Sequence, residues 1–288
     1  MSDQPGCCMQ KLFTKILVPV AFNRNTRWSV EKAVQLANKF GCDLFLVHAL
    51  APSRSLFNLY NSFFTGSVLV DSRNEIYKKL KNLELELRPK LKEGLLLSSA
   101  VSIGYWQSVL KDFIIAEHID LALIPRSHRR FKSPVLRSIN INRLSQQTSC
   151  PIMTITRTFN VNHLRNVVVP IHDHLPVKKL LVAHYLTMET GCNIYLMSNN
   201  SDAAPMTEKD YLMKAYQLLT DIDKVGIHCA LRENTDTAAG TLAYARDISA
   251  NLIVVNPGRE SSLRGWWNHL QGKHLCRESD IPVMTVAV

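Results

Sequence analysis

The sequence predicts an α/β fold in which two doubly wound domains follow one another in one chain. Short apolar runs rich in β-branched residues alternate with amphipathic helical patterns, which is typical of parallel strands covered by helices on both faces. The layout of residues 120–155 also returns without a gap at residues 251–286. In both copies the interval from the first residue to the proline is 31 (151 − 120 and 282 − 251). We therefore expect two parallel sheets with right-handed crossovers.

The first half of the chain contains five expected strands. The first strand stops at Ala21, and the helix that follows is expected to be capped by Asn25 or Thr26 and to end at Gly41. A helix with Trp106 on its buried face leads into the fourth strand. The expected strands are residues 15–20, 43–48, 95–104, 120–124 and 151–155.

The interval between the second and third strands is the longest stretch without a strand. Residues 52–66 are rich in aromatic side chains and fit no regular pattern. The residues after them fit one long amphipathic helix, which is expected to cover the sheet. The apolar stripe of this helix comprises Ile76, Leu80, Leu83, Leu87 and Leu91.

The second half of the chain repeats this order of strands and helices. The glycine that ends the first helix, Gly41, returns as Gly191. The offset between the copies falls from 150 at these glycines (191 − 41) to 131 at the fourth strands (251 − 120). The first copy thus has about nineteen extra residues, which we assign to residues 52–66. We expect one domain at residues 12–158 and a second at residues 164–288.

Composition and length exclude several classes of protein. The 288 residues suffice for two domains with a core each, and the 46% hydrophobic and 20% charged residues are typical of a globular chain. Residues 1–10 lack the apolar segment of a signal peptide, and no apolar run approaches the ~18 residues of a membrane span. We therefore expect a cytoplasmic protein that does not use a membrane.

Formal charge is divided unevenly along the chain. Residues 1–158 contain 22 Lys and Arg against 11 Asp and Glu, whereas residues 159–288 contain 12 against 13. The two parts therefore carry +11 and −1 of the total +10. This asymmetry indicates an anionic partner for the first half.

Few residues are candidates for a metal or redox site. The seven cysteines form no Cys-x-x-Cys pair, so we expect Cys42, Cys150, Cys192 and Cys229 to be buried, reduced thiols. The run His172-Asp173-His174 has metal-ligand types, but adjacent residues of one loop seldom complete a site, and no metal is expected. Trp266 and Trp267 follow helical spacing and are expected to pack against the sheet or a partner.

The strand sequences and their order resemble those of one family. The first copy contains the runs ILVPV, GCDLFLVH, DLALI and CPIMTI in this order. Together they resemble the universal stress protein family in its tandem two-domain form, over residues 12–158 and 164–288. The resemblance implies five parallel strands per domain in the order 3-2-1-4-5. It also implies that domains pair through their last strands, here within one chain, with a homodimer as an alternative.

In the ATP-binding branch of that family, the loop after the fourth strand reads Gly-x2-Gly-x9-Gly-Ser/Thr. All six glycines are replaced here, and a side chain forced into a glycine-only conformation costs about 1 to 2 kcal/mol. The acidic residue that the family places after the first strand is Ala21 in one copy and His172 in the other. We therefore expect no family-standard ATP site and no cofactor. The loop positions are occupied by Pro125, His128, Ser138 and Ile139 in the first copy and by Asn256, Arg259, His269 and Leu270 in the second.

The same loop of the first copy, residues 126–137, is strongly basic. Two interpretations stay open: a loop that simply faces water, or arginine side chains that bind a phosphate or an acidic partner without glycines. On the second interpretation the ligand-binding residues are Val20, Ala21, Arg126, His128, Arg129, Arg130 and Ser138.

The function expected from these observations is that of a stress-associated regulatory or interaction protein, with a protein partner or a small anionic ligand. One alternative is a sensor that binds a nucleotide or phosphorylated metabolite through the basic loop of the first domain. A second alternative, a nucleotide-dependent enzyme, rests on fold analogy alone. No known catalytic motif occurs, so we expect no enzyme, and no nucleic-acid-binding motif is recognised.

Overall fold

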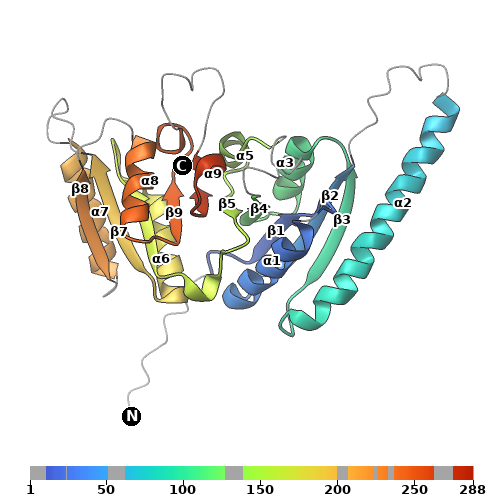
Figure 1. Ribbon diagram of the computed structural model, residues 1–288, viewed down its shortest axis with the longest axis horizontal. Helices are drawn as coiled ribbons and strands as arrows, with labels where there is room; N and C mark the ends of the chain where they lie inside the picture. Colours follow the sequence, from blue (N-terminus) through green and yellow to red (C-terminus); the bar gives the residue numbers. More distant parts are fainter. Residues whose placement is uncertain are drawn as a thin grey trace, which may run out of the picture.

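The computed structural model describes residues 11–23, 25–50, 62–126, 139–199, 207–222, 226–232, 237–262 and 275–287. Strands and helices alternate along the first half, as expected (Figure 1). This half consists of β1 (Lys15–Pro19), α1 (Thr26–Phe40), β2 (Asp43–Leu50), α2 (Ser62–Leu87), η2 (Arg88–Lys90), β3 (Leu97–Ile103), α3 (Trp106–Ala116), β4 (Leu121–Pro125), α5 (Ile141–Thr148) and β5 (Ile152–Ile155).

The second half follows the same order after a short 3-10 turn. No helix in the described stretches combines the length and the apolar character needed to cross a membrane. This half consists of η3 (Val161–His163), β6 (Asn166–Pro170), α6 (Val177–Thr190), β7 (Asn193–Asn199), α7 (Thr207–Ile222), β8 (Ile227–Arg232), α8 (Thr237–Asp247), β9 (Leu252–Val255), η4 (Arg259–Ser261), α9 (Leu275–Glu278) and β10 (Val283–Thr285).

The ten strands of the described residues form one sheet, in the order β3-β2-β1-β4-β5-β10-β9-β6-β7-β8. Each half has the predicted order 3-2-1-4-5, and every pair is parallel except β5 with β10, which is antiparallel. Met153 lies opposite Met284 at the centre of this pair. The predicted pairing of the two domains through their last strands within the chain is therefore confirmed.

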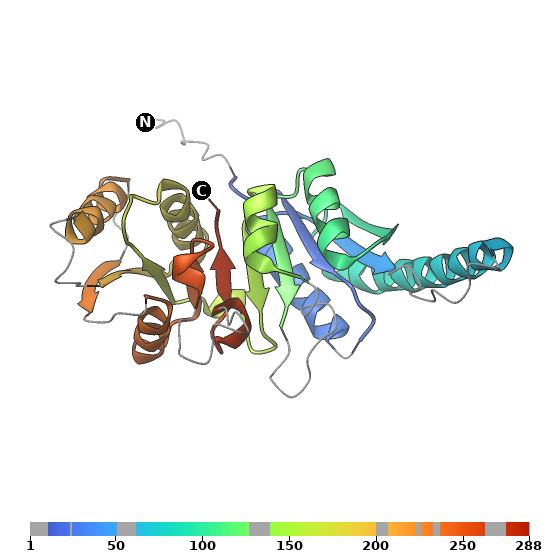
Figure 2. The ribbon, with the colours of Figure 1, turned by 90° about the horizontal axis from the view of Figure 1, so that it is seen from above.

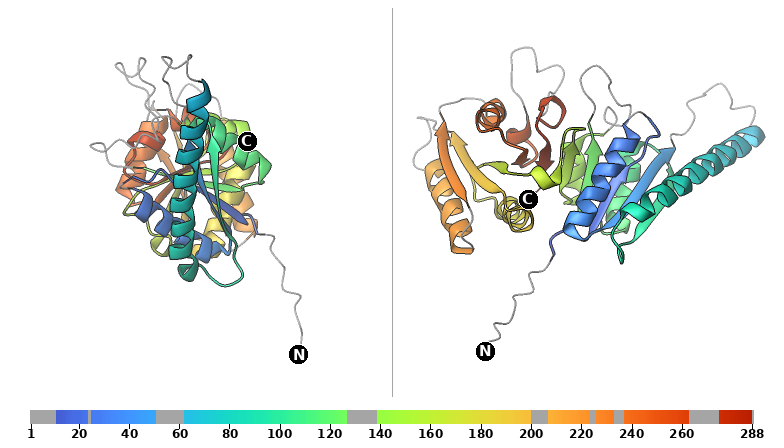
Figure 3. Two further views of the ribbon diagram at one scale, coloured as in Figure 1. Left: turned by 90° about the vertical axis from the view of Figure 1, so that its right-hand side faces the viewer. Right: turned by 60° about the horizontal axis from the view of Figure 1, so that its bottom comes forward.

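Helices cover both faces of the sheet (Figures 2 and 3). One face buries the apolar sides of α1, α2, α6 and α7, and the other face buries those of α3, α5, α8 and α9. Both hydrophobic cores run through the two domains without a break. The domains thus share their cores as well as their sheet.

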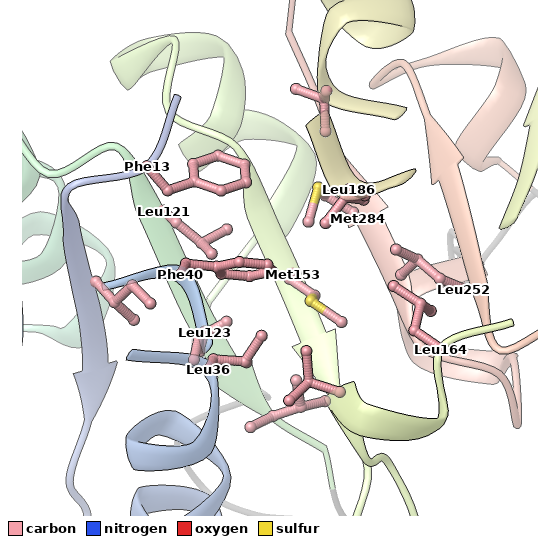
Figure 4. Close-up of a cluster of buried hydrophobic side chains, with 14 of the residues drawn as sticks. Phe13, Leu36, Phe40, Leu121, Leu123, Met153, Leu164, Leu186, Leu252 and Met284 are labelled. Carbon is pink, nitrogen blue, oxygen red and sulfur yellow. The ribbon is translucent and has the colours of Figure 1, made fainter. Parts of the chain in front are cut away.

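Aromatic side chains close the junction between the domains on the first of these faces. The Phe13 and Phe40 rings contact the Tyr185 ring of α6, at centroid distances of 5.2 and 5.8 Å. Figure 4 shows Phe13, Phe40 and the two methionines in the same cluster. The linker contributes too, because Phe159, Val161 and Leu164 are buried against this core.

At the amino edge of the sheet, one side chain per domain holds the start of the first strand. The Asp120 carboxylate accepts from the backbone N–H groups of Thr14 and Lys15, at 2.8 and 3.0 Å. In the second domain, the Asn251 side chain accepts from the N–H groups of Arg165 and Asn166, at 2.8 and 3.2 Å. The repeat seen in the sequence is therefore a repeat of specific contacts.

Three expectations about the elements are wrong in detail. Helix α2 begins at Ser62, so the last residues of the segment 52–66 are helical rather than irregular, whereas residues 51–61 lie outside the described stretches. Strand β3 begins at Leu97, two residues later than expected. Cys229 is exposed because β8 is an edge strand, whereas Cys42, Cys150 and Cys192 are buried as expected.

Candidate functional site

The strand order places the candidate site at the carboxyl edge of the sheet. In open α/β sheets, ligands bind at this edge where the strand order reverses, which here is between β1 and β4 and between β6 and β9. The two domains therefore offer two equivalent positions. Their side chains differ.

In the first domain, the candidate residues Val20 and Ala21 directly follow β1. Val20 is buried, and its carbonyl accepts a hydrogen bond from Nδ1 of His48 at 2.7 Å. Burial lowers the pKa of His48, which favours the neutral imidazole with its proton on Nδ1. The first carbonyl after β1 is thus already bonded within the protein.

Three rings gather at this edge of the first domain. The His48 ring lies 5.6 Å from the Phe22 ring and 5.6 Å from the Trp106 ring, centroid to centroid. Phe22 has a left-handed backbone (φ +48°), which turns the chain sharply after β1. The sequence indicated His48 only as a strand residue and Trp106 only as part of a helical stripe. Their convergence follows from the order β3-β2-β1, which brings the ends of these strands together.

Arg126 is the only proposed loop residue of the first domain within the described stretches. Its N–H donates to the carbonyl of Ile155 at 2.8 Å, and its side chain is half-buried. The pKa of Asp280 is lowered mainly by a hydrogen bond from Arg246, and the Arg126 charge contributes as well.

The remaining candidates in the basic loop, His128, Arg129, Arg130 and Ser138, lie outside the described residues. Their part in a site stays a prediction. The described chain resumes at Ile139, which is fully buried.

In the second domain, a buried ion pair lies at the equivalent position. Nζ of Lys179 on α6 donates to both carboxylate oxygens of Glu260, at 2.8 and 2.7 Å, and also to the carbonyl of Pro170 at the end of β6. The N–H of Asn256, directly after β9, donates to the same carboxylate at 2.7 Å. The side chains of Lys179 and Glu260 are 0% and 6% exposed. Burial lowers the pKa of Lys179, and the Glu260 charge opposes that shift.

This ion pair has no counterpart in the first domain. With the repeat offsets of 150 and 131, Lys179 corresponds to Ser29 and Glu260 to Arg129. Ser29 is buried and its hydroxyl donates to the carbonyl of Thr26 in its own helix, at 2.9 Å. The first domain therefore has neither the lysine nor the carboxylate.

His174 of the second domain belongs to a hydrogen-bonded chain. Nδ1 of His174 lies 2.8 Å from the Asp173 carboxylate, and its Nε2 lies 3.2 Å from the Asn256 amide nitrogen. The hydrogen bond from His174 lowers the pKa of Asp173. In the part of the chain that the structure describes, no three His, Cys, Asp or Glu side chains are grouped as metal ligands. Trp266 and Trp267 lie outside that part.

Comparison with known proteins supports one family. The model of the universal stress protein family matches residues 12–156. A universal stress protein from Archaeoglobus fulgidus superposes with a TM-score of 0.64 and 13% identity, over 96% of this chain and 99% of that one. A protein of unknown function from Pseudomonas aeruginosa, PA1789, gives 0.60 and 13%, over 96% and 92%. At these identities the solved structures support the fold alone. A search of curated proteins found no match.

Proposed function

Because the chain belongs to the universal stress protein family, we propose that it is a regulatory or interaction protein whose ligand or partner contacts lie in the first domain. The main support is a difference between the two positions at which the strand order reverses, one in each domain. In the second domain, Glu260 accepts from the Asn256 N–H, and Lys179 donates both to Glu260 and to the Pro170 carbonyl. In the first domain the corresponding residues are Ser29 and Arg129, neither of which carries a carboxylate.

Two features argue against ATP binding of the family-standard kind. Pro125, at the first glycine position of the first domain, has no N–H to offer a phosphate. In the second domain the equivalent N–H, that of Asn256, is bonded to Glu260. Neither domain has the family's acidic residue after its first strand, because Ala21 and His172 stand there.

A second candidate function is a sensor that binds a nucleotide or phosphorylated metabolite in the first domain. The ring cluster of Phe22, His48 and Trp106 favours it, because rings at the carboxyl end of these strands can contact a flat ligand. A hydrogen bond between charged groups contributes about 1.5 to 3 kcal/mol, so two arginines could support a weak site. A cytoplasmic location stays a prediction for either function.

Titration calorimetry with Mg-ATP and with pyrophosphate tests both functions on the full chain. We expect ATP to bind no more tightly than about 1 mM, equivalent to about 4.1 kcal/mol. If an anion binds, Arg126→Ala with Arg130→Ala should weaken it at least about tenfold, or 1.4 kcal/mol. The matched control is Arg259→Ala with Arg264→Ala in the second domain, which should leave binding unchanged. Micromolar binding of ATP would contradict the proposal, and anion binding lost only in the control variant would contradict its placement in the first domain.

A further inference from the structure

The Glu260 carboxylate of the second domain is held by donors that come from other elements. The ammonium group of Lys179 belongs to α6, and the Asn256 N–H belongs to the end of β9. Both donors reach the carboxylate at 2.7 to 2.8 Å, and Lys179 is itself completely buried. This is the arrangement of a protein site for a small anion: a buried cation and a backbone N–H directed at one carboxylate.

We propose that the second domain contains an anion-binding site whose resident anion is the chain's own Glu260 side chain. The site takes a small carboxylate as its ligand class. In the intact protein Glu260 excludes every competing anion, because it is attached four residues after Asn256 and is therefore always present at high local concentration.

The donor side of this site does not depend on Glu260 for its position. The Lys179 ammonium is also bonded to the carbonyl of Pro170, and that carbonyl belongs to a central strand of the sheet. The Asn256 N–H is fixed because the preceding strand β9 pairs with both β6 and β10. Lys179 and the Asn256 N–H therefore each keep an anchor that does not involve the carboxylate.

Glu260, the acceptor of these hydrogen bonds, lies on a short turn that makes further hydrogen bonds of its own. Gly258, with φ +109°, begins the turn, and its N–H donates to Oγ of Ser261 at 3.1 Å. Asn142 of α5, in the first domain, donates to the same Oγ at 2.8 Å. The turn that carries Glu260 is thus joined to the first domain, whereas both donors belong to the second.

Removal of the carboxylate should create a vacancy for an external anion. Glu260→Ala deletes two carbons and two oxygens, the heavy atoms of acetate, and leaves Lys179 as a buried cation without its counter-charge. An uncompensated buried charge strongly favours any anion that can reach it. Acetate should therefore stabilise this variant specifically, and acetamide, which has almost the same shape but no charge, should not.

The experiment measures the Tm of the full-length Glu260→Ala variant in acetate, acetamide and chloride at equal ionic strength. We expect acetate to raise its Tm by about 2 to 4 °C, the shift produced by a ligand at about ten times its Kd. Wild type should show no such shift. Glu75→Ala is the matched control, because Glu75 also pairs with a lysine, Lys79 at 2.6 Å, but on the exposed surface of α2. An equal response to acetate and acetamide, or an equal shift in Glu75→Ala, would overturn the proposal.

A second variant separates the site from a general effect of acetate. Lys179→Met with Glu260→Ala removes the cation as well, so the acetate shift should disappear, and a shift of the same size would refute the inference. If Glu260→Ala does not fold in chloride, its refolding yield is measured in acetate and in acetamide. Recovery in acetate alone supports the proposal, and no recovery in either counts against it. None of these outcomes depends on a ligand in the first domain.

Discussion

The two domains resemble each other at the amino ends of their strands and differ at the carboxyl ends. At the amino edge the domains use the same contact: Asp120 in one and Asn251 in the other accept from the first backbone N–H groups of β1 and β6. At the carboxyl edge they differ, because Lys179 and Glu260 have no equivalents in the first domain.

This difference shows which contacts the fold requires. A strand that begins in the middle of a sheet needs partners for its first N–H groups, and a short Asp or Asn side chain supplies them in either copy. The carboxyl edge carries loops, and loops tolerate change. The second domain has a buried ion pair after its fourth strand, whereas the sequence of the first domain continues there into a basic loop.

The largest effect is expected at the strand pair where both domains meet. Met284→Lys should lower the free energy of unfolding by more than about 4 kcal/mol, because it buries an ammonium group without a partner. Met153→Lys should cost about as much, since the two methionines lie opposite each other in β5 and β10. Urea unfolding followed by circular dichroism measures both. The control is Met213→Lys on α7, where the side chain is 45% exposed and the change should be small. A mild effect in only one of the two methionine variants would show that the junction is not symmetric.

The next largest effect is expected when Lys179 of the second domain is replaced by serine, the residue at the corresponding position of the first domain. Lys179→Ser leaves the Glu260 carboxylate buried with one N–H donor, and such uncompensated charges cost about 3 to 5 kcal/mol. A change at the corresponding position of the first domain should cost less: Ser29→Ala removes one hydrogen bond within α1, worth about 1 kcal/mol. Chemical unfolding measures the loss in free energy of unfolding for both variants. Equal losses would mean that the ion pair contributes no more than an ordinary polar contact.

The smallest effects are expected at the amino ends of the strands, where both domains use the same kind of contact. Asp120→Ala should cost about 1.5 to 3 kcal/mol and Asn251→Ala about 1 to 2 kcal/mol, the difference reflecting the charge of the carboxylate. Asp112→Ala serves as the control, because that side chain is 70% exposed. Thermal unfolding of the three variants is sufficient. A cost below that of the control in either domain would show that its contact is dispensable.

Sequence patterns predicted the strands because strands depend on local apolar runs and on a repeat with fixed offsets. The strand order and the pairing of the last strands were implied by the resemblance to the universal stress protein family. They could not predict the Lys179–Glu260 pair, because its members are 81 positions apart. Lys179 follows another lysine in α6, and nothing local indicates that Lys178 donates to a surface carbonyl while Lys179 is buried. Glu260 lies in a loop that was considered only for its missing glycines and its arginines. The exposure of Cys229 was predictable in principle, since the order 3-2-1-4-5 makes the third strand of each domain an edge.

The antiparallel pair in the middle of the sheet also has a consequence for biosynthesis. The partner of Met153 is Met284, so the ribosome must add 131 further residues (284 − 153) before β5 can be completed. At about 5 to 20 residues per second, the nascent first domain presents an open, apolar strand edge for roughly 7 to 26 s. Such an edge can template pairing with a neighbouring nascent chain. The length of the second domain therefore sets the interval during which the edge of β5 has no partner from its own chain.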